Sequence, residues 1–453
     1  MENKIPIPII RMNRTGCCSL ILLLVSLMAP GCATSPSKES APGLVPPVQQ
    51  ALRPAAQNSA ASPVTPPPAV SPEVDSPKPV PVLLPPAGVP SSPPAPSETT
   101  SEAVSPQIRD RVAAGGAVVL RNVVLTEDVT WRGEILVEGD ATVAPQATLT
   151  IEPGTYIRFR SAGEGQKSAL LVQGRISAIG TADRPVVISG DFTPFLAGDW
   201  QGIVLLATEK NNLLEHCRIQ GAEIGLEASF SRIVIRNVDF ATCRTGASFH
   251  DSLVTITGGG ARDCVAGVRL SDSEADIREA NFSANGNAII AVASSLAMEG
   301  ATLFGNEQTA LSAEKSRVRV RGSSFSVNGN GLKFNGCEGS VIANRILNNR
   351  AFGLEVASSR LKISSNDISG NGKVGLRVEG GRSMAWGNVF SGNTGYDIQN
   401  SGTEEFTAIG NWWGGIPDTD ILSRIFGGSV RVLPPLRERP AAVPPVQPSP
   451  AVR

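Results

Sequence analysis

Two aspartates and a histidine are the residues of this sequence best suited to acid–base chemistry. Asp251 and Asp272 lie 21 residues apart, and His250 is next to the first of them. Carboxylates and an imidazole close to one bond can act as general acid and base in polysaccharide cleavage. Other residues suited to proton transfer are scarce, because the chain has only two histidines and two tyrosines. Acidic residues are also common at solvated turns, so a turn without chemistry is the alternative interpretation.

Cations alternate with apolar residues in two stretches of the chain. Arg317, Arg319 and Arg321 form the first stretch, and Arg360 and Lys362 form the second. Outward arginines and lysines of this kind could bind an acidic glycan or a lipopolysaccharide phosphate. They could equally be a solvated surface, since no aromatic residue is interleaved with them for sugar stacking.

The pair His216-Cys217 suggests a metal ligand, but its surroundings argue against this. In Leu214–Ile219 the alternation places Cys217 on the apolar face and turns His216 toward water. The sequence therefore predicts no metal site and no cofactor. Cys243 and Cys264 are one repeat apart, and either a disulfide or two stacked free thiols is compatible with that spacing.

Most of these residues belong to a repeat of 21 or 22 residues that covers 232–400. One apolar column contains Phe240, Ala261, Phe282, Leu303, Phe325, Ile346, Ile368 and Phe390. Three residues after each member stands a second column, made of Cys243, Cys264, Asn285, Asn306, Asn328, Asn349, Asn371 and Asn393. A fixed period with a fixed offset between columns indicates a solenoid.

Apolar and polar residues alternate within each repeat, as in 317–321, which indicates short strands with one buried face. A repeat of this length accommodates three strands, and successive coils would stack about 4.8 Å apart. The asparagine column should form a hydrogen-bonded ladder of side-chain amides. We also expect these asparagines to supply the positive φ of a turn.

The repeats resemble the right-handed parallel β-helix family, which includes pectate-lyase-like enzymes. Residues 149–155, 171–181 and 198–203 resemble the opening coils of bacterial envelope β-helices, and Asn411-Trp412-Trp413-Gly414 resembles the tryptophan motif that closes many of them. The resemblance covers roughly 117–433 and implies an all-β, single-stranded parallel β-helix of about 12 coils. Its enzymes usually attack acidic polysaccharides from an outer groove, but the fold also hosts binding and structural proteins.

The N-terminal third has the composition of an export signal and a linker. Residues 1–32 combine basic residues with a short apolar run, and Ala29-Pro30-Gly31-Cys32 resembles a bacterial lipobox in which Cys32 is lipidated. An ordinary cleaved signal is the alternative. Residues 33–106 hold most of the 35 prolines and should form a disordered tether.

Short helices are expected at both ends of the β-helix domain, 107–433, because open strand edges need a cover. Gln107–Ala114 is the N-terminal candidate, and Asp418–Phe426 is the C-terminal one. The apolar residues of the second would lie on one helical face. Residues 434–453 are rich in proline and should be disordered.

Two functions from different classes remain open. With a net charge of −1 and no basic stripe, the chain is not expected to bind nucleic acid. The first hypothesis is a monomeric, non-catalytic outer-membrane lipoprotein, periplasmic or surface-facing, that presents an elongated surface to polysaccharide or an envelope protein. The second is a polysaccharide lyase, hydrolase or epimerase. The tether and the scarcity of acid–base residues favour the first.

Lipidation of Cys32 can be tested by fractionation. Cys32→Ser should move the protein from the membrane to the soluble fraction, because the thiol that would carry the lipid is lost. Unchanged membrane association of this variant would contradict the lipoprotein hypothesis.

Overall fold

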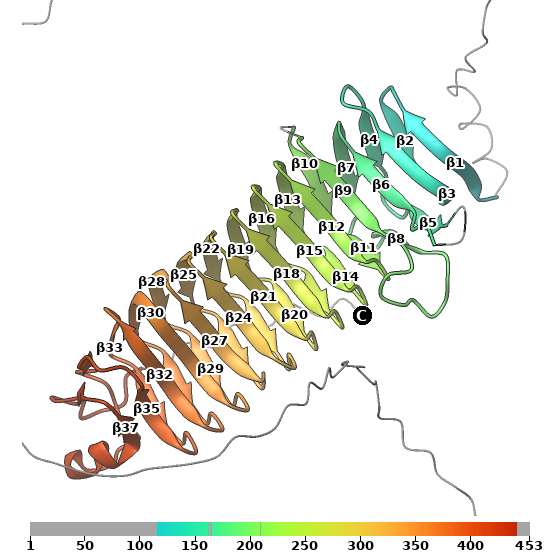
Figure 1. The fold of residues 1–453 in the computed structure, drawn as a ribbon. Helices are drawn as coiled ribbons and strands as arrows, with labels where there is room; N and C mark the ends of the chain where they lie inside the picture. Colours follow the sequence, from blue (N-terminus) through green and yellow to red (C-terminus); the bar gives the residue numbers. More distant parts are fainter. Residues whose placement is uncertain (1–115, 162, 164, 209, 442–453) are drawn as a thin grey trace, which may run out of the picture. The chain divides into compact units, whose positions relative to one another are not determined.

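A computed structural model describes residues 116–441, except 162, 164 and 209. The expected signal peptide, Cys32, the tether and the N-terminal capping helix lie outside the described residues. What the structure describes is a right-handed solenoid of parallel strands with almost no helix (Figure 1). Within these residues, no helix combines the length and the apolar character needed to cross a membrane.

Each coil contributes strands to three faces, and a strand usually pairs with the third strand after it. The first face consists of β2 (Val129–Trp131), β4 (Thr148–Ile151), β7 (Arg175–Ile179), β10 (Asn212–Glu215), β13 (Arg232–Arg236), β16 (Leu253–Thr257), β19 (Glu274–Arg278), β22 (Ser295–Glu299), β25 (Arg317–Arg321), β28 (Glu338–Ile342), the end of β30 (Phe352–Ser364), β33 (Met384–Trp386), β36 (Phe406–Thr407) and β38 (Val430–Arg431).

The second face consists of β1 (Val118–Leu125), β3 (Glu134–Val143), β5 (Tyr156–Arg160), β8 (Val186–Gly190), β11 (Cys217–Gln220), β14 (Asp239–Ala241), β17 (Gly260–Arg262), β20 (Asn281–Ser283), β23 (Thr302–Phe304), β26 (Ser324–Ser326), β29 (Arg345–Leu347), β31 (Asp367–Ser369) and β34 (Val389–Ser391). The third face consists of β6 (Ala169–Val172), β9 (Gly202–Leu206), β12 (Ile224–Ser229), β15 (Thr245–His250), β18 (Ala266–Ser271), β21 (Asn287–Val292), β24 (Thr309–Glu314), β27 (Asn330–Asn335), the start of β30, β32 (Val374–Gly381), β35 (Tyr396–Asn400) and β37 (Ile425–Gly427). The ends of β1 and β3 also extend onto the third face.

The described part has about 14 coils, against the expected 12 or so. The additional coils lie at the C-terminal end, where β36 and β38 are strands of only two residues. A strand as short as β36 shows no alternation of apolar and polar residues, so the sequence pattern does not reveal it, whereas the sequence does predict a last strand at 430–433, which contains β38.

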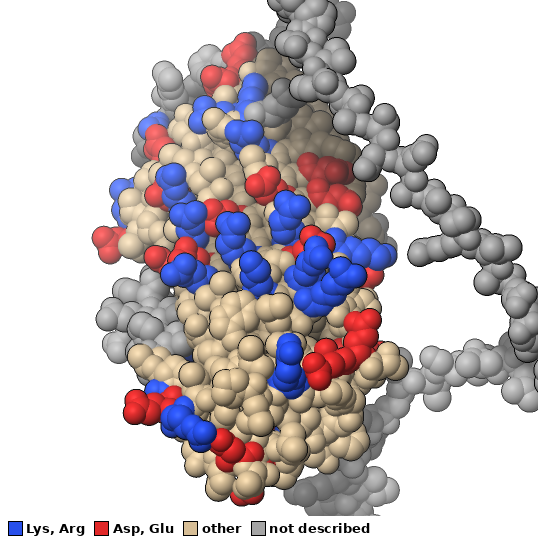
Figure 2. Space-filling view, turned by 90° about the vertical axis from the view of Figure 1, so that its left-hand side faces the viewer, with Lys and Arg blue, Asp and Glu red and all other residues tan. Residues whose placement is uncertain are grey.

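The core is a set of apolar columns that run along the solenoid. Phe325 is fully buried and pairs in register with Leu303 before it and Ile346 after it, as the repeat predicts. In β25 the burial alternates strictly, with Val318 and Val320 inside and the arginines outside. The outward positions are therefore polar and charged, and Figure 2 shows Lys and Arg gathered in a band on the face that it presents.

The asparagine column forms a continuous ladder inside the coil. Each side-chain oxygen accepts two hydrogen bonds from the preceding asparagine; Asn349, for example, donates from its backbone N at 3.1 Å and from Nδ2 at 3.0 Å to Oδ1 of Asn371. Nδ2 of Asn371 also donates to the carbonyl of Ile346 at 3.1 Å. Cys264 begins this series by donating its backbone N–H to Asn285 at 3.1 Å. Every amide of the ladder is thus buried and satisfied.

The expectation that these asparagines adopt positive φ is wrong. The left-handed residue is the one before each asparagine, as at Ala284 (φ 54°), Val327 (φ 61°) and Asn348 (φ 54°). The physical reason is that the ladder asparagine must point its amide inward, so the reversal of the chain falls on its more exposed neighbour.

The other two corners have ladders that the sequence analysis did not identify. A second amide ladder lies between the first and second faces and consists of Asn344, Asn366, Asn388 and Asn411. The backbone N–H of each member donates to the side-chain oxygen of the next at 2.9–3.0 Å. Between the third and first faces, serine hydroxyls accept the backbone N–H of the preceding coil at 3.0–3.1 Å, in a column made of Ser231, Ser252, Ser273, Ser294 and Ser316.

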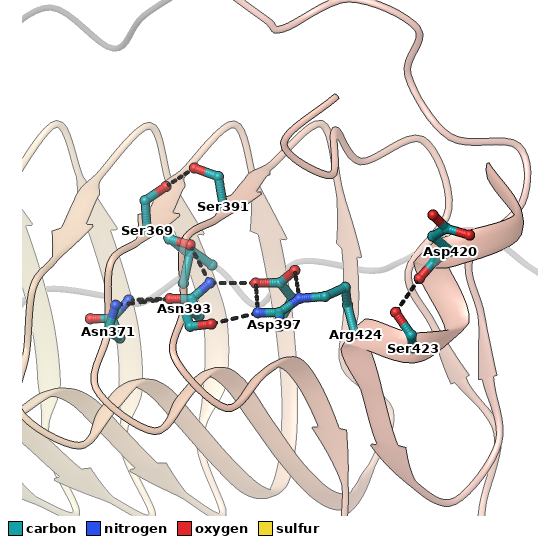
Figure 3. A network of polar contacts seen from close by, with 9 residues as sticks. Ser369, Asn371, Ser391, Asn393, Asp397, Asp420, Ser423 and Arg424 are labelled. Carbon is teal, nitrogen blue, oxygen red and sulfur yellow. Dashed lines mark hydrogen bonds and ion pairs between the residues drawn. The ribbon is translucent and has the colours of Figure 1, made fainter. Parts of the chain in front are cut away.

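An ion pair terminates the asparagine ladder at the C-terminal end. Nδ2 of Asn393 donates to Oδ1 of Asp397 at 2.7 Å, and Nε of Arg424 donates to Oδ2 of the same carboxylate at 3.1 Å (Figure 3). Asp397 is buried, so the guanidinium offsets the cost of removing its charge from water. The last amide of the ladder thereby keeps a partner although no further asparagine follows at this corner.

The C-terminal cap differs from the expected helix. Residues Asp418–Arg424 form a 3-10 helix, and the chain then extends into β37. Of the predicted apolar face, Ile421 is buried, whereas Leu422 and Phe426 are exposed. A 3-10 helix repeats every three residues, so the helical face drawn for 3.6 residues does not apply. Residues 434–441 of the expected tail contact the last coils, with Arg439 paired to Asp367 at 3.0 Å.

Removing a core aromatic should be costly. Phe325→Ala should lower the free energy of unfolding by about 3–5 kcal/mol, because it leaves a cavity between two packed coils. Arg319→Ala, on the outward side of the neighbouring β25, should be nearly neutral. Denaturant titration measures both, and equal effects would mean that the inward register is wrong.

The asparagine ladder gives a second stability prediction. Asn371→Leu removes the acceptor of two Asn349 donors and the donor to Ile346, at roughly 1–3 kcal/mol for each buried group left unpaired. Asn371→Gly should also destabilise the protein, because it removes the same amide. Glycine brings no conformational advantage at position 371, since the residue with positive φ is Gly370.

Asn335→Ala is the matched control, since Asn335 is exposed and takes no part in the ladder. Thermal melts should show it close to wild type. Wild-type melting of both Asn371 variants would show that the ladder does not stabilise the fold.

Candidate functional site

Four of the five cations singled out by the sequence line one cleft on the first face. Arg317 and Arg319 come from β25, and Arg360 and Lys362 come from β30, two coils further on. Their strands alternate exposed and buried residues, so all four side chains point outward. Two coil spacings separate the two pairs by about 10 Å.

The floor of the cleft is formed by β28, which runs between the two pairs of cations. In register, Ser340 lies between Arg319 and Lys362, and Glu338 lies between Arg317 and Arg360. Gly339 has φ +134°, and a Cβ there would stand 1.8 Å from the carbonyl oxygen of the preceding coil, so only glycine fits. The cleft has a volume of about 470 Å³ and is completed by Arg382, Met384, Val318 and Leu361.

The cations of the cleft are not neutralised by the protein. The cleft has five cations: Arg317, Arg319, Arg360, Lys362 and Arg382. Within the described part of the chain, no carboxylate oxygen lies within 4.0 Å of their side-chain nitrogens, the limit for an ion pair. The third face of the same coils differs, because Glu355 there holds Lys333 at 3.8 Å and Arg377 at 3.0 Å. The cleft therefore presents unpaired positive charge to solvent, which suits an anionic ligand.

A second hollow adjoins the cleft across the row of Arg317 and Arg319. It measures about 500 Å³, and its far wall carries Glu274 and Asp276. Asp276 is already held by Arg278 at 2.7 Å. The sign of the charge thus changes across the arginine row, and the acidic wall makes the second hollow less suited to an anion than the cleft is.

The fifth predicted cation, Arg321, lies on the same strand but outside the cleft. Its in-register neighbours are Glu299 and Ile342.

The side of the solenoid labelled β28, β30 and β33 in Figure 1 is the side that Figure 2 faces. The two views together place the band of basic side chains there.

His250 and Asp251 lie together, but at a corner rather than in the cleft. His250 Nε2 is 3.1 Å from Asp251 Oδ2, and both side chains are about half exposed. Phe230 packs edge-on against the imidazole with centroids 5.7 Å apart. Asp251 and Asp272 both have positive φ, 44° and 50°, and occupy the same turn position in adjacent coils. Their acid–base role stays a prediction, and the turn accounts for their presence without it.

The cysteines are small buried groups, and His216 lies at a turn. His216 has φ 48°, and its Nε2 is 3.5 Å from Nδ2 of Asn237. Burial raises the pKa of the Cys217 thiol to about 12, so it remains protonated and is a poor ligand. Cys243 and Cys264 are both free thiols. Over the described residues, no cluster of three His, Cys, Asp or Glu side chains suits a metal ion.

Sequence reasoning missed several outward residues of this surface, namely Glu338, Ser340, Arg382, Met384 and Trp386. The signal was present, because Arg317, Glu338, Arg360 and Arg382 follow one another at the repeat spacing. Trp386 likewise follows Ser364 by one repeat and is its partner in β33. Extending the period from the apolar columns to the outward positions would have grouped them.

Several solved structures resemble the chain at low identity. A point mutant of the periplasmic alginate epimerase AlgG shares 12% identity over 66% of this chain and 77% of its own, with a TM-score of 0.39. The A-module of the Azotobacter vinelandii mannuronan C-5 epimerase AlgE6 shares 14% over 73% and 93%, with a TM-score of 0.33. The catalytic unit of a GH87 α-1,3-glucanase from Streptomyces thermodiastaticus shares 12% over 72% and 65%, with a TM-score of 0.23. No curated protein sequence matches the chain.

Two family models match the solenoid in sequence. Residues 120–229 match a pectate-lyase-like β-helix domain, and residues 266–412 match a right-handed β-helix region. Both matches fall on the stacked coils described above, one on the irregular N-terminal coils and one on the regular repeats. Sequence and architecture agree, and the chain belongs to the right-handed parallel β-helix proteins of the pectate-lyase-like type.

Proposed function

We propose that this protein is a non-catalytic β-helix protein that binds an anionic glycan in the cleft of its first face. The observation that carries the proposal is the cluster of five cations without carboxylate partners in the described part of the chain. Holding like charges together is unfavourable unless an anion is bound, so such a cluster is more informative than scattered surface cations.

The chemistry of the lining residues matches carboxylates or sulfates on a sugar. Arg319 and Arg360 offer planar guanidinium groups that can bind an oxyanion through two parallel hydrogen bonds. The hydroxyl of Ser340 lies between the two rows and can donate to the same ligand. The two rows are on different coils, so an extended polymer lying across the strands would contact both.

The composition of the cleft favours binding over catalysis. Acid–base cleavage of a glycosidic bond needs a proton donor and a proton acceptor on the two sides of that bond. Glu338 is the only carboxylate of the cleft, and its lining includes no histidine or tyrosine. The pair His250–Asp251 lies at a corner of the coil, outside the lining of the cleft.

We place the protein in the cell envelope on the basis of its N-terminal sequence. The lipobox-like Cys32 and the proline-rich 33–106 would hold the solenoid at the outer membrane on a long tether. A tethered, elongated surface suits contact with an envelope polysaccharide or with an envelope protein that carries acidic groups.

The charge of the cleft can be reversed without touching the core. The double variant Arg319→Glu, Lys362→Glu should weaken binding of polygalacturonate at least about tenfold, because two attractive contacts become repulsive. Wild-type binding should weaken as salt is added, and uncharged dextran should not bind. Isothermal titration calorimetry measures each affinity.

Arg269→Glu is the matched control, because Arg269 is an exposed arginine on the third face between Ser248 and Ile290. It makes the same charge change as Arg319→Glu alone, but away from the cleft, and it should leave the affinity unchanged where Arg319→Glu lowers it. Equal losses in both variants would mean that net charge, and not the cleft, attracts the polymer. New reducing ends or unsaturated uronates in a wild-type incubation would instead support the polysaccharide-active enzyme.

A further inference from the structure

Trp386 stands apart from the other tryptophans of the protein. Trp131, Trp200 and Trp413 are buried, and Trp412 has the guanidinium of Arg439 over its ring at 5.4 Å. Trp386 is 39% exposed, and in the described part of the chain its ring stacks on no aromatic group and no cation. An indole with an accessible face combines a large apolar surface with a polar N–H group and is therefore able to contact a ligand.

The position of Trp386 places it at the end of the cleft. β33 alternates exposed Met384, buried Ala385 and exposed Trp386, so the two outer side chains project from the same face. Met384 is the in-register neighbour of Lys362 and lines the cleft, and Trp386 is the in-register neighbour of Ser364. The Cα atoms of Lys362 and Trp386 are therefore about 8 Å apart, one coil spacing across and two residues along.

We propose that Trp386, with Met384 beside it, forms a sugar-ring subsite that adjoins the cationic cleft. The proposal rests on the proposed function and deepens it, because it assigns the residues that recognise the sugar ring itself, beside the cations that recognise its acidic group. The cations hold the acidic group of one sugar residue, and the indole supports the apolar C–H face of a ring.

The physical argument is that the two parts of the surface recognise different properties. Inorganic polyphosphate can satisfy the cations but has nothing to place on an indole. A pyranose offers C–H groups on one face, which pack on the electron-rich face of an aromatic ring. Selectivity for acidic sugars over simple polyanions would follow from this arrangement.

Two probes separate these contributions: oligogalacturonate and inorganic polyphosphate. Trp386→Ala should weaken the binding of oligogalacturonate roughly 3- to 10-fold and leave that of polyphosphate unchanged. Trp386→Phe should keep most of the affinity for oligogalacturonate. The same variant should lose the change of tryptophan fluorescence that the ligand produces in wild type, because the other four indoles are buried or covered.

Phe304→Ala is the control, since Phe304 is an exposed aromatic residue on the second face. It should bind both probes like wild type. An equal loss of both probes in Trp386→Ala, or no loss of either, would overturn the ring subsite. Binding of polyphosphate but not of oligogalacturonate by wild type would also overturn it and would keep an anion site. Undiminished binding of both probes by the Arg319→Glu, Lys362→Glu variant would reject the proposed cleft and leave the Trp386 result to stand alone.

Discussion

Backbone N–H groups at the corners of a coil must find acceptors inside the solenoid, and this requirement organises the whole structure. Within strands the neighbouring coil supplies a carbonyl, but at a corner the chain turns away from it. Here the side chain of the next coil takes over, as when Asn328 Oδ1 accepts the backbone N–H of Asn306 at 2.9 Å. An unpaired buried N–H costs about 1–3 kcal/mol. Each corner therefore requires a polar side chain that recurs once in every coil, and this requirement sets the period of the repeat.

The three corners meet this requirement with two main kinds of side chain, asparagine at two of them and serine at the third. Asparagine accepts two bonds and donates one to a carbonyl, so it also satisfies the backbone oxygen left at the corner. Serine accepts from the coil before it and donates to a carbonyl two residues earlier in the chain, as Ser273 does to Ser271 at 2.7 Å. Cys337 takes a serine position, and its thiol donates to Ala313 at 3.3 Å. Because the interior is satisfied this way, the outward residues are free to vary with function.

The sequence contains the interior pattern more plainly than the exterior one. The stacked column of Phe325 and the ladder of Asn371 could be read directly, because the first position carries an apolar residue in every coil and the second carries asparagine in most of them. The serine ladder was missed because serines are common in loops, so a serine that recurs at the repeat spacing does not stand out from the others. The cleft was seen only in part: Arg319 and Lys362 stood out by composition, whereas Trp386 depends on register across coils. The positive φ was assigned one residue too late, since sequence alone does not tell which residue of a turn points inward.

Two outer faces of the same coils carry the same order of charges and treat it differently. On the third face Lys333, Glu355 and Arg377 form ion pairs along the stack, and the charges cancel. On the first face Arg317, Glu338 and Arg360 occupy equivalent successive positions, yet Glu338 pairs with neither arginine. Next to it, Gly339 lets the strand approach the preceding coil where no side chain could fit. Exposed pairs of this kind stabilise a protein by no more than about 1 kcal/mol each, so leaving them open costs the fold little and keeps the cations of the proposed site available to an anion.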